Sequence, residues 1–269
     1  MSSLQSRILV AVVGVPLLLY VVLAAPSFVM ELALVMLASI GGVELQQCVS
    51  GKGQRELVGI SGVCAGLTVV WYYAAPDIIE GFFLLELLIF FGYAIQKGGE
   101  VKFNQIMAGL FGSIAIGWSF ASFLRLEASG VHRAYLLLPF ILSFACDTFA
   151  YFAGLTLGKH KLAPKVSPKK TVEGSIGGLA GNVLCGLLFV WVMDRFFGGS
   201  AIGYGPMAAL ALLCGVVAQI GDLSFSLIKR EFGIKDYGHL FLAHGGVLDR
   251  FDSVLFVAPV VEIIFSLLP

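Results

Sequence analysis

Long apolar runs separated by short polar connections follow one another along the whole chain. The runs lack the two-residue alternation of barrel strands, and most approach the roughly 20 residues that a helix needs to cross the hydrocarbon of a bilayer. Because lipid offers the backbone no hydrogen-bond partners, helices are the structure that suits such runs. The pattern predicts about nine membrane-spanning helices, at residues 7–25, 28–45, 57–75, 77–96, 105–125, 134–157, 174–194, 205–229 and 252–268.

Composition agrees with this interpretation. Hydrophobic residues make up 58% of the chain and charged residues only 13%, which is typical of an integral membrane protein and not of a soluble globule with a large core. The predicted fold class is therefore an all-α, polytopic integral membrane protein. The run 77–96 contains Glu80 and Glu86 and is the least regular of the set.

The 17 Lys and Arg side chains balance the 17 Asp and Glu side chains in number but not in position. If successive helices alternate in direction, every cation except Arg125, Arg133 and Arg195 lies on the same side of the membrane as the N-terminus. Cytoplasmic loops carry an excess of Lys and Arg. We therefore expect the N-terminus and the long loops in the cytoplasm and the C-terminus outside, in a protein of the cytoplasmic (inner) membrane.

Candidate chemistry is concentrated in the second half of the chain. Residues 1–133 hold about five of the predicted helices, joined by short, sparsely charged connections. Residues 134–269 hold about four helices and two polar cytoplasmic loops, 158–174 and 229–252. We interpret the second half as the catalytic part of one membrane domain.

Acidic side chains flank the second of these loops. Asp222, Ser226 and Lys229 follow one another at helical spacing and therefore share a face. Asp249 and Asp252 lie three residues apart where the last predicted helix begins, and they share a face as well. Carboxylates at membrane depth need a cationic partner or water. That partner is either the basic side chains of the same loop or magnesium, which prefers carboxylate oxygen, and the clustering favours magnesium.

The first loop, GKHKLAPKVSPKKTVEG, mixes lysines with hydroxyl side chains, prolines and glycines. Lysines hold phosphates as point charges, and the backbone amides at the start of the next helix can bind an anion. The alternative is a polybasic patch that is attracted to anionic lipid headgroups. The mixture of residue types indicates more than a run of lysines.

Asp147 lies inside the sixth predicted helix without a polar neighbour in sequence. It must face the protein interior, where the loop lysines or the metal site are its expected partners and a structural polar contact is the alternative. Glu31, Glu86 and Glu262 are weaker candidates, because each stands alone near a predicted helix.

Glycines four residues apart open the seventh predicted helix. Gly174 and Gly178 form one such pair, and Gly177 and Gly181 form another. This spacing lets a second helix approach closely, and we interpret it as packing in preference to ligand contact.

The segment 226–252 resembles the signature of the phosphatidate cytidylyltransferases, also called CDP-diacylglycerol synthases. The matching positions are Ser226, Lys229, Arg230, Lys235, Asp236, Gly238, His244, Gly245, Gly246, Asp249, Arg250 and Asp252. The upstream stretch SPKKTVEGSIGG is similar to a second conserved block of that family, whereas the first half of the chain matches only in hydropathy. The departure is Leu242-Ala243, which stands where the family has Pro-Gly, so another conformation must make this turn.

The resemblance implies that CTP and phosphatidic acid react to give CDP-diacylglycerol and pyrophosphate, with magnesium at one or two cation positions. The implied metal ligands are Asp222, Asp249 and Asp147. The implied catalytic residues are Lys229, Arg230, Lys235, Asp236, His244, Arg250 and Asp252, and the implied substrate-binding residues are Ser167, Lys169, Lys170, Thr171, Glu173, Gly174 and Ser226. As partners we expect CTP, phosphatidic acid, the lipid bilayer and a second copy of the chain, and no nucleic acid.

Two other functions remain open. A CTP-dependent lipid kinase of the polyprenol kinase type would transfer the terminal phosphate and release CDP in place of pyrophosphate. A secondary transporter would place its ionisable groups near the middle of the membrane, within internal repeats. The sequence shows no such repeat, and its charges are concentrated at one end of the predicted helices.

Overall fold

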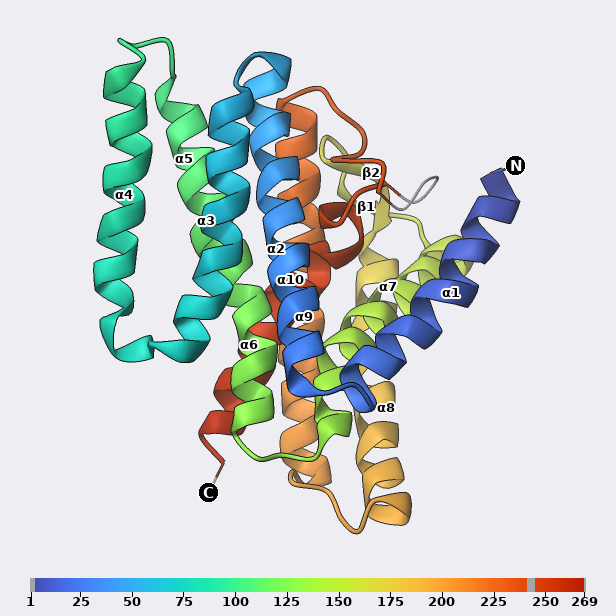
Figure 1. Ribbon diagram of the computed structural model, residues 1–269. Helices are drawn as coiled ribbons and strands as arrows, with labels where there is room; N and C mark the ends of the chain where they lie inside the picture. Colours follow the sequence, from blue (N-terminus) through green and yellow to red (C-terminus); the bar gives the residue numbers. More distant parts are fainter. Residues whose placement is uncertain (1–2, 241–244, 269) are drawn as a thin grey trace. The chain divides into compact units, whose positions relative to one another are not determined.

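The computed structural model describes residues 3–240 and 245–268, and these residues are mostly helical (Figure 1). The helices are α1 (Ser3–Leu23), α2 (Ser27–Ser50), α3 (Arg55–Ala74), α4 (Ile79–Gln96), α5 (Phe103–Phe111), α6 (Gly117–Ala128), α7 (Leu138–Leu157), α8 (Val172–Phe196), α9 (Tyr204–Glu231) and α10 (Leu248–Ser266). A π-helical turn, Gly112–Ile116, joins α5 to α6, and short 3-10 turns occupy Gly51–Gly53, Pro76–Ile78 and Arg133–Leu137.

Within the described part of the chain, seven helical segments are long and apolar enough to cross a membrane, by length and composition. They lie between Ser27 and Glu231. The described side chains of α1 add a shorter apolar segment, Val12–Leu23, and α10 carries Asp249, Arg250, Asp252 and Glu262. The predicted class of an all-α, polytopic membrane protein is therefore confirmed, and the number of nine crossings stays a prediction.

The chain forms two compact units. Unit 1 contains Met1–Arg125 and Glu231–Phe251, and unit 2 contains Leu126–Arg230 and Asp252–Pro269. The loop 229–252 thus belongs mostly to unit 1, whereas the loop 158–174 belongs to unit 2. The division of the chemistry at residue 133 stays a prediction.

Unit 1 contains a buried polar cluster in which Glu86 of α4 is fully buried. Its two carboxylate oxygens accept hydrogen bonds from the hydroxyls of Thr68, at 2.9 Å, and Ser113, at 3.0 Å. Ser113 lies in the π-helical turn. The interpretation of Glu86 as an isolated acid was therefore wrong, because its partners come from other helices and cannot be read from neighbouring residues.

Two charged connections of unit 1 lie together at one end of its helices. The Lys97 ammonium, just after α4, forms an ion pair of 2.7 Å with Glu56 in the first turn of α3. The connection between α2 and α3 and the connection between α4 and α5 therefore lie together, as the alternating helix directions predict. Because Glu56 is exposed to water and Lys97 is only partly buried, this pair contributes little to stability.

In unit 2, α7 and α8 pack closely through glycines of α8. A Cβ atom added to Gly178 would lie 2.8 Å from the carbonyl oxygen of Cys146, and one added to Gly174 would lie 2.7 Å from that of Ala150. Real Cβ atoms are not found so near a backbone oxygen. The interpretation of the glycine spacing as helix packing is confirmed.

A two-stranded antiparallel sheet precedes α8, with strands β1 (Lys161–Ala163) and β2 (Ser167–Thr171). The sequence did not predict this hairpin, because its strands are short and rich in lysine and proline. Pro168 is tolerated because a strand at a sheet edge can lack one N–H donor. Arg230 supports the turn, since its Nε donates to the carbonyl oxygen of Val166 at 3.3 Å.

Candidate active site

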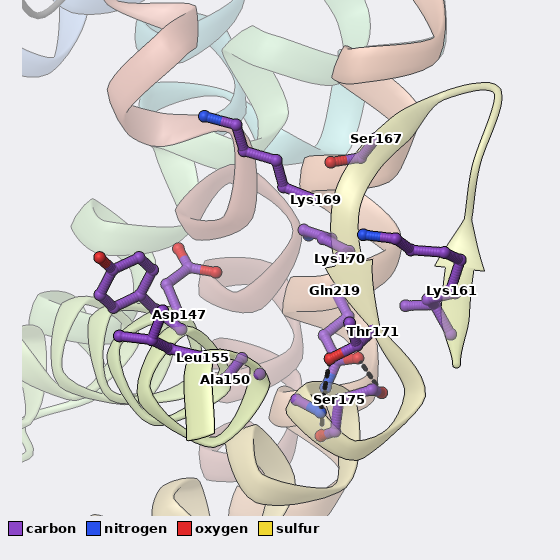
Figure 2. A pocket seen from close by; sticks show the side chains of 14 residues that line it. Asp147, Ala150, Leu155, Lys161, Ser167, Lys169, Lys170, Thr171, Ser175 and Gln219 are labelled. Atoms are coloured by element: carbon purple, nitrogen blue, oxygen red, sulfur yellow. Dashed lines mark hydrogen bonds between the residues drawn. The ribbon is translucent and has the colours of Figure 1, made fainter. Parts of the chain in front are cut away.

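A cavity of about 540 Å³ lies beside the hairpin in unit 2. One wall is polar and comes from β2, and the other is mostly apolar and comes from α7 (Figure 2). Its volume is within the range of small-molecule sites. The lining residues are Asp147, Ala150, Tyr151, Gly154, Leu155, Lys161, Leu162, Ser167, Lys169, Lys170, Thr171, Gly174, Ser175 and Gln219.

The base of the hairpin is fixed by two side chains predicted to bind substrate. Thr171 caps α8, because its hydroxyl oxygen accepts the backbone N–H of Gly174 at 3.1 Å. Glu173 accepts the backbone N–H of Lys159 at 3.0 Å and lies 2.6 Å from Nδ1 of His160. These contacts stabilise the loop, and the substrate-binding roles of Thr171, Glu173 and Gly174 stay predictions.

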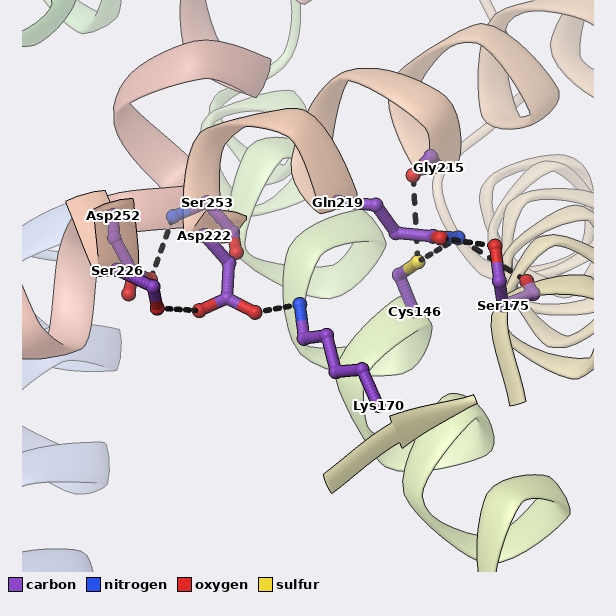
Figure 3. A network of polar contacts seen from close by, with 9 residues as sticks. All are labelled: Cys146, Lys170, Ser175, Gly215, Gln219, Asp222, Ser226, Asp252 and Ser253. Carbon is purple, nitrogen blue, oxygen red and sulfur yellow. Dashed lines mark hydrogen bonds and ion pairs between the residues drawn. The ribbon is translucent and has the colours of Figure 1, made fainter. Parts of the chain in front are cut away.

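The centre of the site is an ion pair between the loop 158–174 and the acidic helix segment that precedes the loop 229–252. Lys170 of β2 contacts Asp222 of α9, and the hydroxyl of Ser226 donates to the other Asp222 oxygen at 3.5 Å. Figure 3 shows Lys170 and Ser226 on opposite sides of this carboxylate. The shared face of Asp222 and Ser226 is confirmed, and among the described residues the cation paired with Asp222 comes from the first loop.

Further carboxylates surround the same lysine. Burial lowers the pKa of Lys170 below its ordinary value, and the nearby Asp147 and Asp252 carboxylates partly offset this effect. Asp147 of α7 thus lies near enough to a loop lysine to interact with its charge, and its role in the site stays a prediction.

This donor set suits magnesium in its chemistry. Asp147, Asp222 and Asp252 bring carboxylates from α7, α9 and α10 to the surroundings of Lys170. Magnesium needs one or two protein carboxylates and completes its octahedral shell with water and substrate phosphates. Among the residues described here, no group of three or more His, Cys, Asp or Glu side chains already forms a ligand cluster. The residues that would hold the ion are therefore Asp222 with Asp147 or Asp252.

Asp249, the other predicted metal ligand, belongs to unit 1. Its Oδ2 accepts the backbone N–H groups of Tyr237, at 2.7 Å, and Gly246, at 2.9 Å, and so fixes the turn before α10. A role for Asp249 as a ligand stays a prediction beside this observed structural one.

The remaining candidates of the second loop are mostly exposed. Lys235, Asp236, Arg230 and Arg250 are exposed and Lys229 is half-buried. The roles predicted for them stay predictions. His244 and the Leu242-Ala243 departure lie outside the described residues.

Two residues near the predicted groups escaped the sequence analysis. Gln219 lines the cavity, and its Nε2 donates to the carbonyl oxygen of Ser175 at 3.1 Å while its Oε1 accepts from the hydroxyl of Ser175. It precedes Asp222 by one helical turn, and this spacing could have identified it. Glu44 of α2 holds the start of α10 through backbone hydrogen bonds, and nothing near it in sequence marks it.

Comparison with known proteins gives matches over nearly the whole chain. Residues 5–268 match the family described as the cytidylyltransferase family. A protein of Staphylococcus aureus (strain COL) named phosphatidate cytidylyltransferase is 31% identical over 262 residues, which cover 96% of this chain and 96% of that protein. Proteins of the same name from Bacillus subtilis (strain 168) and Staphylococcus haemolyticus (strain JCSC1435) are 30% and 33% identical, over 99% and 78% of this chain and 99% and 80% of theirs.

Proposed function

This chain belongs to the cytidylyltransferase family, and on that premise we propose that it is a phosphatidate cytidylyltransferase. The enzyme transfers CMP from CTP to phosphatidic acid, giving CDP-diacylglycerol and pyrophosphate. The structural observation that carries the proposal is the contact between Lys170 and Asp222 beside the cavity. This contact brings Lys170, from the loop proposed to bind phosphates, next to Asp222 of α9, which is proposed to bind magnesium.

The reaction brings two polyanions together. A phosphate oxygen of phosphatidic acid attacks the α-phosphorus of CTP, and the bond from that phosphorus to the oxygen bridging to the β-phosphate breaks as pyrophosphate leaves. Catalysis of such a transfer depends on neutralising charge and on placing the attacking and leaving oxygens in line. A strong general base is not required, because a phosphomonoester, with a second pKa of about 6, is already ionised near neutrality.

The side chains of unit 2 have separate roles in this proposal. Lys169 and Lys170 hold the phosphates of CTP, and an incoming phosphate competes with Asp222 for the Lys170 ammonium. Ser167 and Ser226 supply hydroxyls. Magnesium, when bound at Asp222 with Asp147 or Asp252, supplies positive charge for the phosphate oxygens.

The second loop supplies further cations. Lys229, Arg230, Lys235 and Arg250 are proposed to bind phosphate oxygens, because cations stabilise the charge that spreads over the phosphoryl group. Asp236 and His244 keep the catalytic roles that the family resemblance implies.

The apolar wall of the cavity suits the lipid substrate. Tyr151 and Leu155 of α7 are 65% and 69% exposed and lie on the lining. Phosphatidic acid arrives from the bilayer and CTP from water, so the site must lie at the membrane interface. We place it at the cytoplasmic face of the cytoplasmic membrane, because the cation-rich loops are expected there. A homodimer is also proposed, and the mass of the detergent-solubilised protein tests it.

Labelled CTP tests the reaction. Purified protein should move label from the α-phosphate of CTP into lipid and release pyrophosphate only when phosphatidic acid and magnesium are both present. Label that enters lipid from the γ-phosphate would instead indicate a lipid kinase, and the proposed function would be wrong. Removal of magnesium with a chelator should stop the transfer, and its return should restore it.

A further inference from the structure

Glu44 is a buried carboxylate that lies far along the sequence from every motif identified above. It lies in α2, a predicted membrane helix, and is only 5% exposed. Its Oε1 accepts the backbone N–H of Val247 and its Oε2 accepts that of Leu248, each at 2.9 Å. These amides lie 203 and 204 residues away in sequence. All of these residues belong to unit 1.

The two amides are among those that a helix cannot satisfy by itself. The first N–H groups of an α-helix have no intrahelical partner, and α10 begins at Leu248. A carboxylate at this position satisfies both donors and interacts favourably with the positive end of the helix. Glu44 therefore determines where α10 begins and how the chain enters it.

Two glycines of the signature, Gly238 and Gly246, are fitted to the same carboxylate. A Cβ added to Gly238 would lie 2.9 Å from Cδ of Glu44, and one added to Gly246 would lie 2.5 Å from it. Neither glycine has the positive φ that would itself demand glycine. The absent side chains thus make room for Glu44, which packs against Gly238 and Gly246.

Asp249 gives a second support to the described residues on either side, through its bonds to the amides of Tyr237 and Gly246. Glu44 and Asp249 together engage the backbone of the segments 237–240 and 245–248. The stretch that they hold lies between Lys235 and Arg250, to which the proposed function assigns phosphate binding.

We propose that Glu44 is a positioning residue of the transfer reaction, which fixes the entry into α10 and thereby the placement of the second loop. This inference rests on the proposed function. Glu44 itself does not touch substrate. It acts through the backbone of Val247 and Leu248, so its loss should lower the rate of transfer without weakening the binding of CTP by the hairpin lysines.

Glu44→Gln tests the inference, with Glu86→Gln as the matched control. Glutamine has nearly the same shape, but its amide has only one oxygen acceptor. Its NH2 group would therefore face the backbone N–H of either Val247 or Leu248, and two donors cannot form a hydrogen bond. Glu86 is also a buried glutamate of unit 1, and its partners are hydroxyls that can either donate or accept. We expect kcat to fall about 100-fold in Glu44→Gln, the loss that a displacement of about 1 Å can cause. The CTP concentration for half-maximal rate should not change, and Glu86→Gln should retain the wild-type kcat.

Hydrogen exchange of a peptide covering residues 245–250 gives a readout that does not depend on activity. Exchange should be faster in Glu44→Gln and unchanged in Glu86→Gln. A wild-type kcat in Glu44→Gln, or an equal loss in both variants, would overturn the inference. If the wild-type protein forms no CDP-diacylglycerol, the proposed function fails, and the exchange rates still decide whether Glu44 holds the turn.

A double-mutant cycle adds a test of the close packing. Gly238→Ala alone should lower kcat about tenfold or more, because its Cβ would meet Glu44, and misplacements of this kind lower rates steeply. In a Glu44→Ala background the same change should lower kcat no further, since the obstructing side chain is gone and contacting residues are not additive. Additive losses would show that Gly238 does not act through Glu44, and the inference would be wrong.

Discussion

Asp222 has two partners in the structure, Lys170 and Ser226, and the proposed reaction assigns it a third, magnesium. To bind magnesium, the side chain at position 222 must carry a negative charge. To anchor Lys170 alone, it is enough that the side chain accepts a hydrogen bond. The amide of asparagine keeps an acceptor and removes the charge. This difference separates the two roles at a single residue.

Asp222→Asn should therefore abolish turnover while the protein remains folded. We expect a loss of about 100-fold or more, because charge neutralisation by the metal is a main contribution to phosphoryl transfer. The measurement is the initial rate across a series of magnesium concentrations, with thermal unfolding as the check on folding. The control is Asp77→Asn, which alters an exposed aspartate in the connection between α3 and α4. If Asp222→Asn kept most of its rate at limiting magnesium, Asp222 would not be a metal ligand.

Two lysines of the hairpin region give a matched pair for the nucleotide site. Lys169 lines the cavity, whereas Lys165 lies in the turn between β1 and β2 and does not line it. Both are exposed. A site for CTP distinguishes between them, but a polybasic patch for lipid headgroups does not, because its attraction depends on total charge.

Lys169→Met should raise the CTP concentration for half-maximal rate about tenfold, since a charged hydrogen bond contributes roughly 1.5–3 kcal/mol. Lys165→Met should leave it unchanged. The measurement is CTP saturation at fixed phosphatidic acid in vesicles of constant composition. Equal effects of the two substitutions, together with a weaker dependence on anionic lipid, would favour the lipid-attracting patch.

At the scale of elements, the sequence predicted what local patterns determine. Apolar runs long enough to cross a bilayer mark α2 to α9, and the spacing of Gly174 and Gly178 predicted the close approach of α7 and α8. The hairpin escaped prediction because strands of three and five residues carry no periodic signal. The pairing of Lys170 with Asp222 and the hydrogen bonds of Glu44 escaped prediction. In each case the partner lies far away in sequence, and one sequence contains no record of which side chains meet.

The packing of α7 against α8 leads to a prediction on stability. Gly178→Ala should destabilise the protein by about 1–3 kcal/mol, because overpacking forces neighbouring atoms to shift. Gly92→Ala is the control, since a Cβ at Gly92 of α4 meets no atom within 4 Å and alanine favours a helix over glycine by roughly 0.5–1 kcal/mol. The midpoint of thermal unfolding in detergent should fall for Gly178→Ala and stay the same or rise for Gly92→Ala. A lowered midpoint for both would indicate that close packing is not the cause.

At the scale of the whole molecule, orientation follows from where the cations lie. In unit 2 the connection containing Ser129 precedes α7, and the hairpin containing Lys165 follows it. A helix of 20 residues is about 30 Å long, which matches the hydrocarbon thickness of a bilayer. The two connections should therefore lie on opposite sides of the membrane, with the lysine-rich hairpin in the cytoplasm.

Thiol labelling in intact cells tests this orientation. In a chain whose native cysteines are replaced, Ser129→Cys should react with a membrane-impermeant maleimide, because Ser129 is exposed and predicted to lie outside. Lys165→Cys is exposed as well, but it should react only after the cells are opened, since the hairpin must meet CTP from the cytoplasm. A reporter after Pro269 should likewise lie outside if α1 and α10 both cross the membrane. Labelling of Lys165→Cys in intact cells would show that the orientation is the reverse of the one predicted and that the hairpin lies away from cytoplasmic CTP. If the labelling is as expected but the reporter lies in the cytoplasm, the number of membrane crossings must be even.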